Sequence, residues 1–131
     1  IDNNFYLDGG IIDSIPIKKA LSDKVQKPVV ILTRPIGYRK KDSGIALSKI
    51  IYRKYPKLLE MIKNKATIYN NQLELIEKLE KKNKVFVIRP YEAIKVARTE
   101  KNKEKLKSAY DYGYETMKKE EGRLKSWLSS F

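Results

Sequence analysis

Two continuous apolar runs stand out in a highly charged chain, at residues 28–33 and 85–88. Both are rich in Val and Ile, and each ends at an Arg-Pro pair, Arg34-Pro35 and Arg89-Pro90. Such runs predict strands that are buried on both faces, as in a parallel sheet. A long helical segment separates them, so the order strand, helix, strand predicts a right-handed parallel crossover.

Apolar residues at three- and four-residue steps predict helices between and before these strands. A shorter helix is expected over residues 45–53, with Leu47, Ile50 and Ile51 on one side, and Pro16 can open a short helix over residues 18–21. The longest series predicts an amphipathic helix whose stripe belongs to the core: Leu58, Ile62, Ala66, Tyr69, Leu73, Ile76 and Leu79.

A last helix is expected after Thr99, which can act as its N-cap with Glu100 in the first turn. Trp127 is expected to help seat its end, and its predicted apolar stripe is Leu106, Tyr110, Gly113, Met117, Leu124 and Leu128. The resulting fold class is α/β, with a small, mainly parallel sheet flanked by helices. We also expect an exposed apolar sheet edge, and with it self-association into a homo-oligomer.

The first stretch of the chain is the candidate for chemistry. Residues 3–7 read as a short strand, and Asp8-Gly9-Gly10 as the loop at its C-terminal end, which is where α/β sheets keep their functional groups. A carboxylate there can be aimed by the strand, and the two glycines allow positive φ and close approach of another backbone or a substrate. The alternative is an ordinary turn, because Asp and Gly are common turn formers.

Composition limits the chemistry that these 131 residues can perform. There is no cysteine and no histidine, which removes disulfides, a thiolate nucleophile, the usual general base and the commonest metal ligand. We therefore expect no metal site and no cofactor. The absence of a run of about 18 apolar residues predicts no transmembrane helix. The chain begins at Ile1 rather than Met, from which we expect a fragment of a longer protein.

The formal net charge of +13 raises the question of a polyanionic partner. Only six of the 29 cationic residues are arginine, however, and the lysines are spread through every segment together with many Ile and Asn. Lysine lacks the planar fork with which arginine reads phosphates and bases. The charge is thus interpreted as mainly compositional, and we expect no specific nucleic-acid binding.

A series of short motifs covers nearly all of the chain in a fixed order. As a set they resemble the C-terminal part of a bacterial patatin-like phospholipase, from a branch in which a helical extension follows the catalytic domain. The motifs are Tyr6-Leu7-Asp8-Gly9-Gly10, Ile15-Pro16-Ile17, Leu32-Thr33-Arg34-Pro35-Ile36-Gly37-Tyr38-Arg39-Lys40, Tyr52-Arg53-Lys54-Tyr55-Pro56, Tyr69-Asn70, Leu79-Glu80, Phe86-Val87-Ile88-Arg89-Pro90, Arg98-Thr99-Glu100-Lys101 and Ala109-Tyr110-Asp111-Tyr112-Gly113.

The resemblance implies a serine acyl hydrolase, a phospholipase or lipid esterase, that uses a Ser-Asp dyad. Asp8 would be the dyad aspartate, with Gly9 and Gly10 supporting its loop. The family's Gly-x-Ser-x-Gly elbow and its glycine-rich oxyanion loop are absent from the sequence, and Ser43-Gly44 lacks the elbow pattern. The chain would thus contain half of a dyad and be inactive alone.

The resemblance also implies a domain organisation within a three-layer fold. Residues 1–44 would be the end of the catalytic domain, with the Asp-Gly-Gly loop and the following strand. Residues 45–131 would be a helix-rich C-terminal domain with one further strand. The expected partners are a lipid or acyl-ester substrate and the N-terminal catalytic part of the same protein.

Two other classes of function remain open. One is a non-catalytic interaction domain whose basic, tyrosine-bearing face meets anionic membranes; the other is an RNA- or DNA-binding module. Salt-sensitive binding to liposomes or to oligonucleotides would separate them. The expected location is the cytoplasm, with peripheral contact to the inner face of the membrane as a further option.

Overall fold

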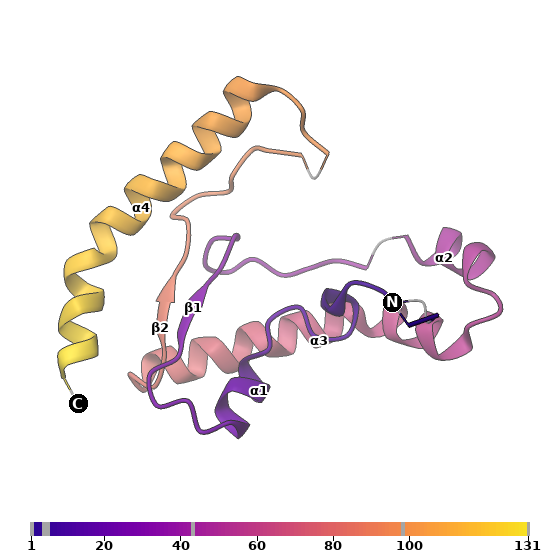
Figure 1. The fold of residues 1–131 in the computed structure, drawn as a ribbon, viewed down its shortest axis with the longest axis horizontal. Helices are drawn as coiled ribbons and strands as arrows, with labels where there is room; N and C mark the ends of the chain where they lie inside the picture. The colour runs from indigo at the N-terminus through magenta and orange to yellow at the C-terminus, as the bar shows by residue number, and fades with distance from the viewer. Residues whose placement is uncertain (1, 4–5, 43, 98, 131) are drawn as a thin grey trace. The chain divides into compact units, whose positions relative to one another are not determined.

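The structure is a computed structural model that describes residues 2–3, 6–42, 44–97 and 99–130. In chain order its elements are the 3-10 helix η1 (Gly9–Ile11), α1 (Ile17–Ser22), β1 (Val29–Ile31), α2 (Ile45–Ile51), α3 (Pro56–Lys81), β2 (Phe86–Ile88) and α4 (Lys103–Ser129) (Figure 1). The chain divides into two compact units. Unit 1 comprises Ile1–Lys24 and Arg39–Lys78, and unit 2 comprises Val25–Tyr38 and Leu79–Phe131.

The long helix expected between the two strands is confirmed as α3. Its predicted stripe is the buried side of the helix, since Ala66, Leu73 and Ile76 are buried and the other members are partly buried. One polar residue, Gln72, is buried within the same face. The short helix opened by Pro16 is also confirmed, as α1, and its first residue Ile17 belongs to the core.

The strand expected over residues 3–7 is wrong where it can be checked. Asn3 lies in a turn with φ of 57°, and Tyr6 and Leu7 have no regular structure and are exposed. Asn4 and Phe5 lie outside the described residues. A strand needs a neighbour for its N–H and C=O groups, and the only sheet in the described part of the chain is formed by β1 and β2.

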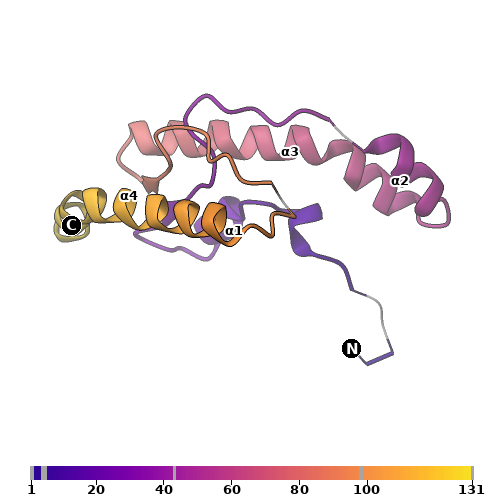
Figure 2. The ribbon, with the colours of Figure 1, turned by 90° about the horizontal axis from the view of Figure 1, so that it is seen from above.

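The helix expected over residues 45–53 is present as α2, although it ends two residues earlier. Gly44, with φ of 74°, precedes it, and it buries none of its residues. Figure 2 shows α2 leading through a short turn into α3. The three apolar residues predicted to share one side, Leu47, Ile50 and Ile51, are all exposed to solvent.

Unit 2 is built on the parallel pair of β1 and β2, in which Val29, Val30 and Ile31 face Phe86, Val87 and Ile88 in register. The prediction of full burial is confirmed for β2, whose three residues are all buried. It is wrong for β1, where Val29 and Ile31 are 39% and 73% exposed. Successive side chains of a strand point to opposite faces of the sheet, and in β1 only the face of Val30 is covered. Self-association through an exposed sheet edge stays a prediction.

Helix α4 begins three residues later than its predicted N-cap would place it. Asn102, not Thr99, is the N-cap, because its side chain accepts a 3.0 Å hydrogen bond from the N–H of Lys105, and Glu104 is the acidic residue of the first turn. Glu100 instead accepts from the N–H groups of Lys101 and Asn102. It closes the turn before the helix.

The buried side of α4 also differs from its predicted stripe. Thr116, Glu120 and Trp127 are buried, whereas Leu106, Tyr110 and Leu128 are exposed. The stripe is confirmed only for Met117 and Leu124, which pack against a cluster of Phe86, Ile88 and Trp127. The prediction failed because it ranked positions by apolarity, while this face buries polar groups that have hydrogen-bond partners in unit 2.

The α/β class with a parallel strand pair is therefore confirmed. The two units combine segments from both sides of residue 44, and the division into domains 1–44 and 45–131 stays a prediction. None of the helices in the described residues is long and apolar enough to cross a bilayer.

The cluster on β2 predicts which core substitution unit 2 tolerates least. The rings of Phe86 and Trp127 lie 5.7 Å apart, so Phe86→Ala should remove this contact and lower the free energy of unfolding by about 3 kcal/mol. Trp127 is the chain's sole tryptophan, and urea unfolding followed by its fluorescence measures the change. Tyr114→Ala, on the exposed side of α4, is the control and should change stability by less than about 0.5 kcal/mol. Equal urea midpoints for the two variants would contradict the assignment of this core.

Candidate functional site

Asp8 caps the 3-10 helix η1. Its carboxylate atom Oδ1 accepts a 2.7 Å hydrogen bond from the N–H of Gly10. A Cβ at position 10 would lie 3.1 Å from the same oxygen, so the absence of a side chain at Gly10 keeps the capped conformation free of crowding. A Cβ at Gly9 would meet no atom within 4 Å, so the backbone there is open to approach. The three predicted site residues thus form one local motif.

The segment that follows η1 is held to α3 by a single buried side chain. The amide of Gln72 donates from Nε2 to Oδ1 of Asp13 and accepts at Oε1, at 3.2 Å, from the N–H of Ile15. Ser14 closes the same segment by donating from Oγ to the carbonyl of Gly10 at 2.7 Å. Asp13 therefore acts as the partner of Gln72.

Asp8, which precedes η1 and this anchored segment, is exposed. Within the described residues, no serine hydroxyl donates to it, and Ser43 lies outside them. The described residues also bring together no group of three or more carboxylates that could hold a metal ion. The loop therefore presents one oriented carboxylate and, in this part of the chain, no nucleophile.

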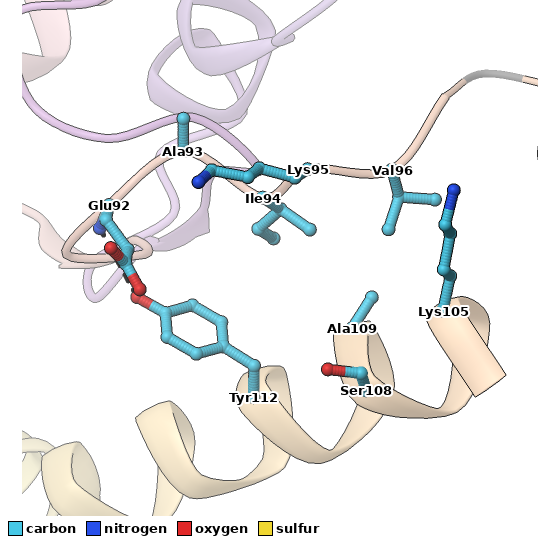
Figure 3. A pocket seen from close by; sticks show the side chains of 9 residues that line it. All are labelled: Glu92, Ala93, Ile94, Lys95, Val96, Lys105, Ser108, Ala109 and Tyr112. Carbon is cyan, nitrogen blue, oxygen red and sulfur yellow. Dashed lines mark hydrogen bonds between the residues drawn. The ribbon is translucent and has the colours of Figure 1, made fainter.

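A separate pocket lies in unit 2, between residues 92–96 and the first turns of α4 (Figure 3). Its volume is about 280 Å³. Figure 3 shows Ile94, Val96 and Ala109 pointing into the space, with the ring of Tyr112 at one end and Lys105 at the other. The centre is thus apolar and the ends are polar.

Two of the polar groups around this pocket are already engaged. The hydroxyl of Tyr112 accepts from the N–H groups of Tyr91 and Glu92 at 3.0 and 3.3 Å, and the ammonium of Lys105 lies 3.6 Å from a carboxylate oxygen of Glu100. The pKa of Glu100 is lowered, mainly by the hydrogen bond from the N–H of Asn102. The N–H of Lys101 and the ammonium of Lys105 lower it further. No hydrogen bond in the described residues joins Ser108 to a carboxylate, so the pocket offers no activated hydroxyl.

A second polar cluster of unit 2 is centred on the carboxylate of Glu120. Its side chain is only 10% exposed, and it accepts hydrogen bonds from Tyr91 Oη at 2.9 Å and Arg123 Nη1 at 2.6 Å. The bond to Glu120 raises the pKa of Tyr91 above its ordinary value, because ionisation of the phenol would place two negative charges side by side. Arg123 also lies over the ring of Phe86, with its Cζ 5.8 Å from the centroid.

Sequence reasoning missed this group of residues. The spacing of Glu120 and Arg123, three apart on a helix, was the available signal, since such pairs meet on one helix face. The partner Tyr91 lies 29 positions away, in the irregular segment that follows β2, and no local pattern identifies it.

The comparison with family models matches residues 55–129, more than half of the chain, to a family described as "Domain of unknown function (DUF6363)". The matched region contains α3, β2 and α4. No curated protein and no solved structure matches the chain.

The bond between Tyr91 and Glu120 predicts an alkaline loss of stability. The pKa of Tyr91 is raised by folding, so this bond contributes in full below the ordinary tyrosine pKa and is lost as pH rises through the raised pKa. In Glu120→Gln, the negative charge is gone and the pKa of Tyr91 should fall toward its ordinary value. An NMR titration of the Tyr91 ring measures the shift. Glu121→Gln removes a neighbouring exposed carboxylate that pairs with Lys125, and should leave the titration of Tyr91 unchanged.

Proposed function

Because the chain belongs to the DUF6363 family, a domain of unknown function, we propose its function from its own residues: it supplies the aspartate of a Ser-Asp dyad in a patatin-like acyl hydrolase. In this proposal residues 1–44 complete the catalytic domain of a three-layer fold, and residues 45–131 form its helical extension. The substrate is a phospholipid or another lipid ester. The serine and the oxyanion hole belong to an upstream part of the same protein.

The observation that supports the proposal is the state of the Asp8 carboxylate. One oxygen is fixed by the N–H of Gly10, the group is exposed, and the segment behind it is anchored to α3 through Gln72. An oriented carboxylate with an open side can accept a proton from a serine hydroxyl placed within about 3 Å. An ordinary capping aspartate makes the same bond to Gly10, so the experiment must separate capping from proton transfer.

The proposed chemistry needs one proton acceptor. As the serine Oγ attacks the ester carbonyl, Asp8 takes the hydroxyl proton, and the oxyanion hole holds the charge on the carbonyl oxygen. The tetrahedral intermediate collapses to an acyl-enzyme, and Asp8 returns the proton to the leaving alkoxide. Water then attacks the acyl group by the same exchange in reverse, which frees the acid and restores the serine.

The variant Asp8→Asn separates the two roles of this residue. Asparagine is as good an N-cap as aspartate, so the bond to Gly10 and the fold should survive, but the amide cannot accept the proton. By comparison with the loss of the aspartate from a serine triad, ester hydrolysis should fall by about three to four powers of ten. The measurement is the hydrolysis rate of a protein that includes the upstream region, together with its thermal melt.

Asp13→Asn is the matched control, because its remaining carbonyl oxygen can still accept the bond from Gln72. It should change the rate by less than about tenfold, since the proton acceptor is untouched. If Asp8→Asn keeps its activity, if the control is the dead variant, or if the protein with its upstream region hydrolyses no ester, the assignment of Asp8 is wrong.

The chain by itself should hydrolyse no ester, because a carboxylate without a nucleophile and an oxyanion hole offers little acyl-transfer catalysis. A fluorophosphonate probe reports activated serines directly and should leave this chain unlabelled, while labelling one serine of the protein with its upstream region. Stoichiometric labelling of a serine in this chain would place the nucleophile here and overturn the proposal as stated.

A further inference from the structure

Helix α2 presents three large apolar side chains to solvent. Leu47, Ile50 and Ile51 are 62%, 73% and 59% exposed. Their spacing of three and four residues places them on one side of the helix, so the exposed groups form a continuous face. Ile45 and Ser48, on the other side, are partly covered. The helix thus turns its apolar side outward, the reverse of the arrangement found on most surface helices.

Helix α2 and the turn after it are positively charged. Residues 45–59 contain no Asp or Glu, and their four cations, Lys49, Arg53, Lys54 and Lys57, are all exposed. Within the described residues, none of these four forms a salt bridge with a carboxylate. The local charge is therefore available to an anionic surface.

Two tyrosines complete the segment in the turn between α2 and α3. The N–H of Tyr55 donates to the carbonyl of Tyr52 at 2.8 Å, which ties the turn, and the ring of Tyr55 is 60% exposed. Tyrosine is enriched where an apolar phase meets water, because its ring is apolar and its hydroxyl is polar. An apolar face, free cations and an interfacial ring thus occur together in one short stretch.

We propose that α2 and the turn after it, residues 45–57, bind an anionic lipid bilayer, with the face of Leu47, Ile50 and Ile51 entering the headgroup boundary. Charge complementarity selects this occupant. Lysine is depleted at interfaces between proteins, whereas interfacial helices combine an apolar face with Lys and Arg that attract anionic lipids. The binding is peripheral, by a seven-residue helix that lies on the surface.

This inference does not depend on the catalytic role of Asp8. Lipid binding needs the apolar face and the cations of α2, while hydrolysis needs the carboxylate at position 8 and an upstream serine. Failure of one experiment therefore leaves the other proposal standing.

The test is co-sedimentation of the chain with vesicles. We expect binding to vesicles of phosphatidylcholine with phosphatidylglycerol, weaker binding as salt rises, and little binding to phosphatidylcholine alone. The triple variant Leu47→Gln, Ile50→Gln, Ile51→Gln keeps good helix formers and removes the face. Its affinity for the anionic vesicles should fall by about tenfold or more.

Matched variants separate this site from the general basic charge of the chain. Lys49→Gln, Arg53→Gln, Lys54→Gln and Lys57→Gln together should also weaken binding about tenfold or more. The control removes four cations from and just before α4, by Lys101→Gln, Lys103→Gln, Lys118→Gln and Lys119→Gln, and should weaken it at most a few-fold. Thermal melts confirm that each variant folds.

Several results would overturn the proposal. These are a wild-type chain that ignores anionic vesicles, a triple variant that binds as tightly as the wild type, and equal losses in the two charge variants. A further overturning result comes from sedimentation without lipid, which measures the oligomeric state. If the wild type is an oligomer that the triple variant converts to a monomer, and vesicles bind neither, a second copy of the chain covers the face instead.

Discussion

The arrangement of unit 1 around Asp8 depends on one buried amide. Gln72 is 5% exposed, and both ends of its side chain are hydrogen-bonded to the segment after η1, through Asp13 and the N–H of Ile15. A buried amide left without these partners costs about 1–3 kcal/mol. The segment is therefore held to α3 by the need to satisfy Gln72 as much as by apolar contact. Asp8 lies five residues before Asp13, so the anchor at Gln72 also limits where Asp8 can lie.

The same helix holds a second irregular segment by the same means. Asn70 accepts from the N–H of Lys40 at 2.8 Å and donates to its carbonyl at 3.0 Å, so one side chain satisfies both backbone groups of that residue. Arg39 adds two 3.1 Å bonds to Glu77, about two turns further along α3. The described residues of unit 1 form no sheet. Side-chain amides on α3 instead provide the hydrogen-bond partners that strand pairing would give to these backbone groups. This explains how irregular segments keep a defined path.

The sequence predicted most reliably the elements whose apolar residues follow one period. The stripe of α3 is the example, because burial and periodicity agree there, and the continuous apolar run of β2 was likewise buried as expected. It failed for β1, where a two-sided apolar run has only one covered side, since the exposure of Ile31 depends on what packs against that face of the strand rather than on local composition. It failed also for α4, whose buried Glu120 is stabilised by Tyr91 and Arg123.

The candidate site shows the same division between local and distant information. It was predictable that one local motif would contain Asp8, Gly9 and Gly10. The contact between Asp8 and Gly10 spans two residues and needs only a turn. Gln72 was not predictable as their anchor, because it sits in the middle of an apolar stripe and its partner Asp13 is 59 positions away. The outward face of α2 required both kinds of information. Its period was visible in the sequence, but the period of Leu47, Ile50 and Ile51 is the same whether the face turns inward or outward, and only the observed exposure distinguishes the two.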